Sequence, residues 1–448
     1  MSDRLFGTNG VRGIINDGMD INLAMQLGKA IGKFMGGKVA VATDTRTSRD
    51  MIKHAVIAGL TSVGVDVMDI GVVPTPTIQY YVKLHPEVKG GVMVTASHNP
   101  PQFNGIKCID ADGTEMHRSN EEVIEGFYQT SVACVTWDRV GRVYPVSGAV
   151  ESYVTDVVSK VNVEEIAKAK LKVVLDCANG AGVYTMPLIL DRLGVRAITL
   201  NADPQGKFPG HPSEPTAENL TDLISLTRES KADLGIALDG DADRTVFIAD
   251  GGEYVPGDKS LALIAKVMLS ERKGTVVTPV SSSSLVEDVV NSSGGKLVYT
   301  AVGSPIVARK MMEIGAVFGG EENGGLIFPE HQYCRDAGMS VAKMIEAIVL
   351  FGPLSSQLQE FPVYHVEKRK IVCPNNQKED LMNFVSEHCQ EDCVDKTDGI
   401  KVIFKDGWVL IRPSGTEPIF RIYSESLDSD SCRKRADQFE IMLLEYLN

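Results

Sequence analysis

The stretch VTASHNPPQFNGIK, residues 94–107, decides the fold that we expect. A β-type run (91–94) leads into it, and two consecutive prolines exclude a helix directly afterwards. Ser97 is therefore predicted to lie on an irregular loop at a strand end, where parallel sheets place their chemistry. Taken alone, such a segment is also typical of a polar turn whose Ser and Asn side chains bond the local backbone.

Two later loops of unusual composition, DGDADR at 239–244 and GEENGG at 320–325, end the same order of predicted elements. Each round reads strand, helix, strand, helix, strand, which indicates repeated α/β units. An apolar run follows each special loop and predicts one more strand. We therefore expect three domains that face one cleft. The expected strands are 39–43, 65–70, 91–94, 172–176, 195–200, 234–238, 275–279, 296–300 and 316–318, and the expected helices are 21–35, 51–63, 77–84, 183–193, 218–228, 285–291 and 305–314.

The pattern changes after about residue 362. A predicted helix at 378–388, a hairpin turning at Asp406-Gly407 and a final helix at 431–447 indicate a small α+β domain. The predicted fold class is thus α/β, with three repeated mixed-sheet domains at 1–150, 151–252 and 253–362. A C-terminal α+β domain, 363–448, completes the chain.

The composition excludes several classes of protein. The 448 residues carry a net charge of −14, which argues against binding to nucleic acid or to an anionic membrane. No apolar run approaches the ~20 residues that span a bilayer, and the N-terminus resembles no signal peptide. The eight cysteines are scattered, as in a reduced cytoplasmic protein, and His388, Cys389 and Cys393 lack a second pair that would make a metal site. Oligomeric state is not predicted.

Asp239, Asp241 and Asp243 alternate directly after a predicted buried strand. In extended backbone such residues point the same way, so their carboxylates are expected to converge. Converging carboxylates repel one another unless a hard cation neutralises them, which predicts a Mg²⁺ site. An EF-hand is excluded because its glycine position holds Arg244. Asp241 to Thr245 also spells D-x-D-x-T, the nucleophile motif of haloacid-dehalogenase-like phosphatases, so an aspartyl phosphatase is an alternative.

Two further loops contain polar groups that suit a phosphorylated sugar. Arg412, Ser414, Gly415 and Thr416 combine a fixed cation, two hydroxyls and a close backbone approach, as a phosphate-binding nest requires. The alternative interpretation of this segment is a hairpin turn in which the arginine has no binding role. Glu321 and Asn323 suit sugar hydroxyls, although such residues are also common in turns. Together with Ser97 as nucleophile and the cation site, these loops predict phosphoryl transfer on a phosphosugar.

At these four motifs the sequence resembles the α-D-phosphohexomutase superfamily over essentially its whole length. The resemblance implies four domains around a central cleft and a Ser97 that is phosphorylated at rest and bonds Mg²⁺ beside the three Asp residues. Phosphoserine would pass its phosphoryl group to a sugar phosphate, and the resulting bisphosphate would turn over in the cleft and return the other group.

The same resemblance assigns further roles to individual residues. Arg12, in FGTNGVRG at 6–13, and Arg244 would steady the transferring group. Lys107 would be a general acid/base candidate and His98 a supporting residue. Gly303 is added to the predicted sugar-binding residues, and Arg421 to the phosphate-binding ones.

The form GEENGG looks most like archaeal members, in which Gly325 stands where many bacterial relatives have His. Together with the opening motif it favours glucosamine 6-phosphate and glucosamine 1-phosphate as the substrate pair. The alternatives within the family are mannose, glucose or pentose phosphates. Outside that activity, an aspartyl phosphatase and a non-catalytic sugar-phosphate sensor are the competing hypotheses.

Overall fold

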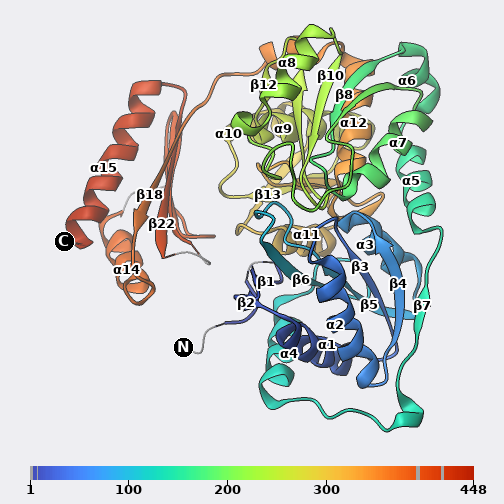
Figure 1. Ribbon diagram of the computed structural model, residues 1–448. Helices are drawn as coiled ribbons and strands as arrows, with labels where there is room; N and C mark the ends of the chain where they lie inside the picture. Colours follow the sequence, from blue (N-terminus) through green and yellow to red (C-terminus); the bar gives the residue numbers. More distant parts are fainter. Residues whose placement is uncertain (1–3, 8, 390–393, 415–417, 448) are drawn as a thin grey trace.

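The computed structural model describes residues 4–7, 9–389, 394–414 and 418–447, and they form four β-sheets with helices packed against them (Figure 1). The first sheet has seven strands, in the order β2 (Gly18–Met19), β1 (Val11–Ile15), β6 (Phe103–Ile109), β5 (Val88–Val94), β3 (Lys38–Thr43), β4 (Asp66–Val72) and β7 (Val143–Pro145). The second has five, in the order β12 (Tyr254–Val255), β11 (Thr245–Ala249), β10 (Leu234–Leu238), β8 (Lys172–Asp176) and β9 (Arg196–Leu200).

The other two sheets also have five strands each. The third runs β14 (Lys296–Thr300), β13 (Thr275–Pro279), β15 (Phe318–Gly320), β16 (Leu326–Phe328) and β17 (Gln332–Arg335). The fourth, which is antiparallel throughout, runs β18 (His365–Val372), β22 (Ile419–Ser426), β21 (Gly407–Pro413), β20 (Ile400–Phe404) and β19 (Val394–Asp395).

The first three sheets repeat one topology. In each, three parallel strands are followed by an antiparallel one: β5–β6, β10–β11 and β15–β16. The loops that carry Ser97, Asp239 to Asp243 and Glu321 connect the two strands of these antiparallel pairs. The expectation of three α/β units with an added strand, followed by an α+β unit, is confirmed. We retain 150, 252 and 362 as proposed boundaries.

Helices cover the sheets, and one of them lies inside the protein. All residues from Ala337 to Ile348 of α12 are buried, because this helix packs between α5, α6 and α9. One hydrophobic core consequently extends through the second and third units, from Leu190 to Phe247, Phe318 and Met344. The helices are α1 (Ile21–Met35), α2 (Arg49–Ser62), α3 (Thr75–Leu84), α4 (Arg118–Thr130), α5 (Ala149–Ser159), α6 (Val163–Ala169), α7 (Met186–Arg192), α8 (Thr221–Glu229), α9 (Gly257–Glu271), α10 (Ser284–Ser292), α11 (Ser304–Ile314), α12 (Ala337–Phe351), α13 (Leu354–Gln359), α14 (Lys378–His388) and α15 (Ser429–Leu447).

The C-terminal unit lies to one side of the other three, with α15 on its outer face (Figure 1). Trp408 and Leu410 of β21 pack against Val280, which follows β13. Lys401 lies over the Trp408 ring at 4.2 Å and donates to the Val280 carbonyl at 2.7 Å. The third unit is thus what holds this domain. None of the helices in the described part of the chain is both long and apolar enough to cross a membrane.

Some predicted elements differ from the structure for local reasons. The expected helix 183–193 is a 3-10 turn (Ala181–Tyr184) followed by α7, because Pro187 favours the first turn of a helix. The strand predicted at 316–318 instead begins at Phe318 and continues into two glycines. A side chain at Gly319 would approach the Val277 carbonyl to 2.7 Å, so glycine is what permits this strand pairing.

Candidate active site

Three loops meet at one place, as the repeated topology requires. Ser97 Oγ of the first loop donates to Asp239 Oδ2 of the second at 2.8 Å. The second loop reaches the third, since Thr245 N donates to the Gly324 carbonyl at 3.2 Å. The convergence that we expected of the three α/β units is therefore confirmed for these loops.

Arg46, which is fully buried, shapes the loop that carries Ser97. Its Nε pairs with Asp44 at 3.1 Å, and its terminal nitrogens donate to backbone carbonyls of the loop. A guanidinium presents its donors in a rigid fork, so several carbonyls are fixed at once. The carbonyls are those of Ser97, Asn99, Pro100 and Phe103, at 2.8, 2.6, 2.7 and 2.9 Å.

Ser97 has a backbone φ of +51°, a left-handed conformation that costs free energy for a residue with a side chain. The residue is 2% exposed. Its carbonyl would lie only 2.6 Å from a Cβ at position 240, so Gly240 allows the two loops to touch. The strained backbone and the close approach together fix Ser97 Oγ against the aspartates.

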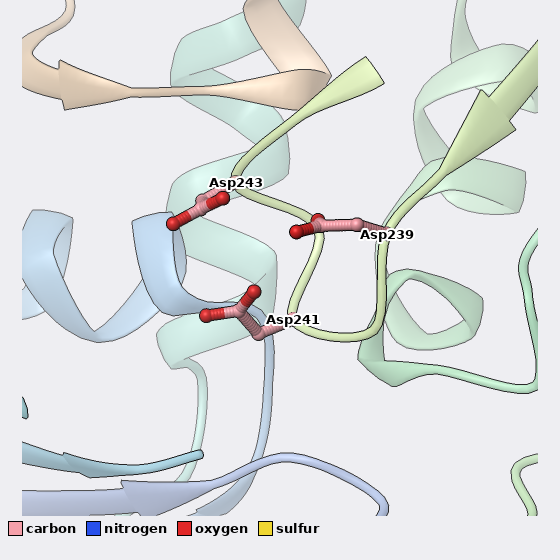
Figure 2. Close-up of side chains that lie close together, drawn as sticks. All are labelled: Asp239, Asp241 and Asp243. Atoms are coloured by element: carbon pink, nitrogen blue, oxygen red, sulfur yellow. The ribbon is translucent and has the colours of Figure 1, made fainter. Parts of the chain in front are cut away.

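The three aspartates of the second loop are buried, and their carboxylates turn toward a common space (Figure 2). One ligand atom from each of Asp239, Asp241 and Asp243 lies within 4.8 Å of the others. The predicted convergence is confirmed, but the reason given for it was wrong. The segment is a tight turn with Ala242 at φ +51°, so its backbone wraps around the space and is not extended.

Cationic and hydroxyl groups already hold one side of this cluster. Asp241 Oδ2 accepts hydrogen bonds from Thr75 Oγ1 at 2.6 Å and from Lys107 Nζ at 2.8 Å. Asp243 Oδ2 accepts from Lys107 at 3.1 Å and from Arg335 at 2.6 Å. Burial alone would lower the pKa of Lys107, but the two carboxylates raise it, so Lys107 is a charged counter-ion here.

The other side of the cluster fits a divalent cation. The Oδ1 atoms of Asp241 and Asp243 are buried and have no hydrogen-bond partner among the described residues. Burial would raise the pKa of Asp241, yet Lys107 and Thr75 hold it well below its usual range. Burial, with Asp243 close by, raises the pKa of Asp239 to about 7. Two orphaned carboxylate oxygens beside a third carboxylate and a serine hydroxyl are an oxygen donor set of the kind that Mg²⁺ prefers.

Arg12, Arg244 and His98 surround Ser97. Arg12 lies on β1 and donates to Asn99 Oδ1 at 2.8 Å. Arg244 Nε donates to Asp239 Oδ2 at 3.1 Å. His98 Nδ1 lies 3.4 Å from Ser97 Oγ. Burial, with Arg244 and Arg12 nearby, lowers the pKa of His98 to about 3, so its imidazole is neutral at physiological pH.

The third loop brings Glu321 to the same cluster. Glu321 Oε2 is 3.7 Å from Arg335 Nη1 and 3.5 Å from Asn323 Nδ2. Burial raises the pKa of Glu321 to about 7, against the effect of Arg335. Gly303, with φ +138°, is the N-cap of α11, and its neighbour Ser304 donates to Glu115 at 2.6 Å.

The predicted phosphate loop connects β21 and β22. Arg412 and Arg421 lie directly opposite each other in the two strands, an arrangement that repels unless an anion is near. Arg412 pairs with Asp398 at 2.9 Å, and Asp398 also accepts from Val302 N beside Gly303 at 2.9 Å. Ser414 is buried at the end of β21. The predicted Gly415 and Thr416 lie outside the described residues.

Sequence reasoning missed three residues that the structure places around the cluster: Arg46, Thr75 and Arg335. Arg46 stood in a polar loop after a strand, DTRTS at 44–48, which was a usable signal because the third strand of the same unit delivers Ser97. Thr75 and Arg335 carry no such signal. Their partners lie 166 and 92 residues away along the chain.

Comparison with known proteins agrees with this geometry. Four family models match in order: phosphoglucomutase/phosphomannomutase alpha/beta/alpha domain I at residues 3–133, domain II at 151–252, domain III at 256–364 and the C-terminal domain at 369–441. A phosphoserine-based, metal-dependent isomerase of phosphosugars is the class that this arrangement defines. The chain belongs to the phosphoglucomutase/phosphomannomutase family of the α-D-phosphohexomutase superfamily.

Individual relatives extend over the whole chain. It is 42% identical over 441 residues to a probable phosphoglucosamine mutase of Methanopyrus kandleri, covering 97% of each chain. It is 40% identical to a phosphoglucomutase/phosphomannomutase of Thermococcus kodakarensis, covering 99% of this chain and 98% of that one. A crystal structure of a family member from Burkholderia thailandensis superposes with a TM-score of 0.88 at 26% identity, covering 99% and 97%.

We expect Asp241→Asn to weaken divalent-cation binding by at least about tenfold, because it removes one of three converging charges. The measurement is the rise in melting temperature with added Mg²⁺, since a ligand at 100 times its Kd stabilises a protein by about 2.7 kcal/mol. Asp222→Asn, an exposed carboxylate of α8 in the same unit, is the control. A Mg²⁺-dependent shift in Asp241→Asn equal to that of the control would contradict the cation site.

Proposed function

We propose that this protein is a Mg²⁺-dependent hexose-phosphate mutase that moves a phosphoryl group between O6 and O1 through Ser97. The contact of Ser97 Oγ with Asp239, 2.8 Å away at the rim of the carboxylate cluster, supports the proposal most directly. An alcohol that carries phosphate needs positive charge beside it when the phosphoryl group leaves or arrives. The cluster is the natural place for that charge.

In this proposal phosphorylated Ser97 meets a sugar monophosphate whose free hydroxyl faces it. The P–O bond to Ser97 breaks as the bond to the sugar oxygen forms, and the sugar becomes a bisphosphate. After the bisphosphate has turned over in the cleft, the Ser97 oxygen accepts the other phosphoryl group. The product is the isomeric monophosphate, and Ser97 is phosphorylated again. No phosphate is gained or lost over the cycle.

The surrounding residues have roles that follow from their positions. Arg12 and Arg244 flank Ser97 and would neutralise the equatorial phosphoryl oxygens. Lys107 remains our general acid/base candidate. Because its pKa is raised, its ammonium would donate a proton, and it would accept the proton of the sugar hydroxyl only after giving up its own. His98, whose imidazole is neutral, would support the serine loop. A bound Mg²⁺ would be held by the three aspartates and would polarise the phosphoryl oxygens.

The far end of the substrate would be bound by the third and fourth loops. Glu321 and Asn323 offer acceptors for sugar hydroxyls, and Gly303 is the third residue that we assign to the sugar. Arg412, Ser414, Gly415, Thr416 and Arg421 would hold the phosphate that is not transferred. The cross-strand pair of Arg412 and Arg421 favours this role, because it places two arginines side by side next to the loop.

Glucosamine phosphate is the substrate that we favour. The GEENGG loop supports it, as does the name of the Methanopyrus kandleri relative, a probable phosphoglucosamine mutase. The Thermococcus kodakarensis relative is named for glucose and mannose phosphates, which keeps those sugars as alternatives. An aspartyl phosphatase is less favoured, since Asp241 is buried and held by Thr75 and Lys107.

Ser97→Ala should lower kcat for isomerisation by about a thousandfold or more, because the phosphoryl carrier is gone. Substrate binding by calorimetry should persist. Intact mass of the wild type should show one phosphoryl group that phosphatase treatment removes and that Ser97→Ala lacks. Ser152→Ala, at an exposed position of α5, is the control. Substantial turnover by Ser97→Ala, or steady release of inorganic phosphate by the wild type, would reject the mutase mechanism.

A panel of glucosamine, glucose, mannose and ribose phosphates should give the highest kcat/KM with glucosamine 6-phosphate. Discrimination of roughly 10- to 200-fold is typical when pockets differ by one small group. A kcat/KM for glucose or mannose phosphate equal to or above that for glucosamine phosphate would reject glucosamine phosphate as the preferred substrate. It would not contradict the mutase activity itself.

Glu321→Gln should remove a pH dependence of the sugar-phosphate KM. Burial raises the pKa of Glu321 to about 7, so the carboxylate form that would accept hydrogen bonds from sugar hydroxyls is lost as pH falls through 7. In the wild type KM should therefore rise up to about tenfold per pH unit below 7. The substrate phosphate also titrates near pH 6, but equally in both proteins. Identical KM–pH profiles for wild type and Glu321→Gln would contradict this role.

A further inference from the structure

Arg335 occupies a position that no part of the proposed mechanism yet uses. It ends β17, opposite Ile327 of β16, and its side chain is only 10% exposed. The next residue, Asp336, caps α12 and accepts a hydrogen bond from the Tyr153 hydroxyl at 2.5 Å. Arg335 is therefore held at the start of the most deeply buried helix of the third unit, which gives its guanidinium a fixed base.

The guanidinium of Arg335 faces three carboxylates that come from separate parts of the chain. Its Nη2 donates to Asp243 Oδ2 of the cation loop at 2.6 Å. Its Nη1 lies 3.7 Å from Glu321 Oε2 of the sugar loop, and its Nη2 is 3.5 Å from Glu115 Oε1 of the first unit. Burial alone would lower the pKa of Arg335, but these carboxylates raise it, so the group is permanently charged.

Glu115 is itself held by hydrogen bonds from its own unit and from the third unit. It accepts hydrogen bonds from Asn9 Nδ2 in the first unit and from Ser304 Oγ in the third, the latter at 2.6 Å. A planar fork can bond two carboxylates at once in set directions, which a lysine ammonium cannot reproduce. The contacts of Arg335 therefore define the orientation of Asp243 relative to Glu321.

Gly325 leaves the space that the side chain of Arg335 occupies. A Cβ placed at position 325 would lie 2.3 Å from Arg335 Cδ and 2.9 Å from its Cγ. Arg335 as it is placed here and any side chain at 325 therefore exclude each other. The glycine in the GEENGG loop thus has a steric reason: it leaves room for an arginine that arrives from a different strand.

We propose that Arg335 is a positioning residue that fixes the cation-binding Asp243 and the sugar-binding Glu321 in one geometry, across the space that Gly325 leaves open. This inference rests on the proposed function, since it concerns how the reacting end and the sugar end of that site are aligned. It adds a residue to the site and assigns a physical role to Gly325. The Arg335 Nε, which is buried without a hydrogen-bond partner among the described residues, fits a group placed there for more than packing.

The test compares Arg335→Ala, Arg335→Lys and Gly325→Ala in the full chain. Arg309→Ala is the matched control, because Arg309 also joins the third unit to the first. It pairs with Asp110 and Asp112 at 2.6 Å and donates to the backbone carbonyl of Glu115 at 3.1 Å, and these contacts do not include Asp243 or Glu321. Arg335→Ala should raise KM for glucosamine 6-phosphate and lower kcat, each by about tenfold or more, as is typical when a residue that orients a metal ligand is lost. Arg335→Lys should recover only part of the loss, and Arg309→Ala should stay within twofold of wild type.

The steric argument gives a second, independent readout. Gly325→Ala should match Arg335→Ala, because its methyl group displaces the arginine. The double variant should be no worse than Arg335→Ala alone, since the methyl group then has space. Additive losses in kcat/KM would overturn the proposal. So would KM and kcat within twofold of wild type for Arg335→Ala, even with a lowered melting temperature, because the residue would then be merely structural.

Calorimetric binding of glucosamine 6-phosphate in the presence of Mn²⁺ separates this inference from the proposed function, because binding needs no turnover. Arg335→Ala and Gly325→Ala should bind at least tenfold more weakly than wild type and Arg309→Ala. A wild type that binds the sugar phosphate but does not isomerise it would reject the mutase proposal while the binding comparison still decides on Arg335. A wild type without measurable binding would overturn both.

Discussion

Mutual repulsion among three buried carboxylates is the constraint on which the centre of this protein depends. At an effective dielectric constant of about 20, two unit charges 4.8 Å apart repel by roughly 3 kcal/mol, and Asp239, Asp241 and Asp243 form three such pairs. The chain opposes that repulsion with a cation from each of its three α/β units: Lys107 from the first, Arg244 from the second and Arg335 from the third. The cluster is stable only when the three units meet, so the same charges that suit a metal ion also hold the units in register. A divalent cation would add to this neutralisation at the Oδ1 atoms of Asp241 and Asp243, which have no hydrogen-bond partner among the described residues.

The repeated topology explains why such a meeting is geometrically available. Each unit turns from its third parallel strand into an antiparallel one, and the connection lies at the carboxyl end of that third strand. Ser97, the aspartates and Glu321 occupy equivalent connections, so one supersecondary unit supplies a nucleophile, a cation site and a polar acceptor by changing only its loop. Rigidity then comes from separate devices. The four carbonyl bonds of Arg46 hold the serine loop, and the buried α12 holds the strand that delivers Arg335.

Much of this could be predicted from the sequence, because the decisive signals are local. Strands such as 172–176 and 234–238 were predicted to the residue, since parallel strands buried on both faces read as continuous apolar runs bounded by turns. Lys107 was named through the family resemblance, and its place in an otherwise apolar strand added modest support. Helices α9 and α12 were not predicted, since a helix that is apolar on nearly all sides lacks the 3.6-residue periodicity that identifies an amphipathic one. Arg335 and Thr75 could not be found at all, because their importance lies in partners that are distant in sequence and that only packing brings near.

The fourth unit is attached to the rest of the protein by other kinds of contact than those that fix the cation cluster. This difference affects how the two ends of a substrate would be held. The cation cluster is fixed by buried ion pairs. The contacts of the C-terminal domain with the third unit instead include Trp408 on Val280, Lys401 on the Val280 carbonyl, Glu425 on Ser284 N and Asp398 on Val302 N. Asp398 also pairs with Arg412, so the guanidinium proposed to hold a phosphate is, in this structure, engaged with a carboxylate that bonds the third unit. An arriving phosphate would compete with Asp398 for Arg412. Binding of the phosphate to Arg412 would therefore weaken the Asp398 contact that joins the fourth unit to the third. The reacting end of the site is thus pre-formed, while the distant end is coupled through Asp398 to the placement of the domain that carries it.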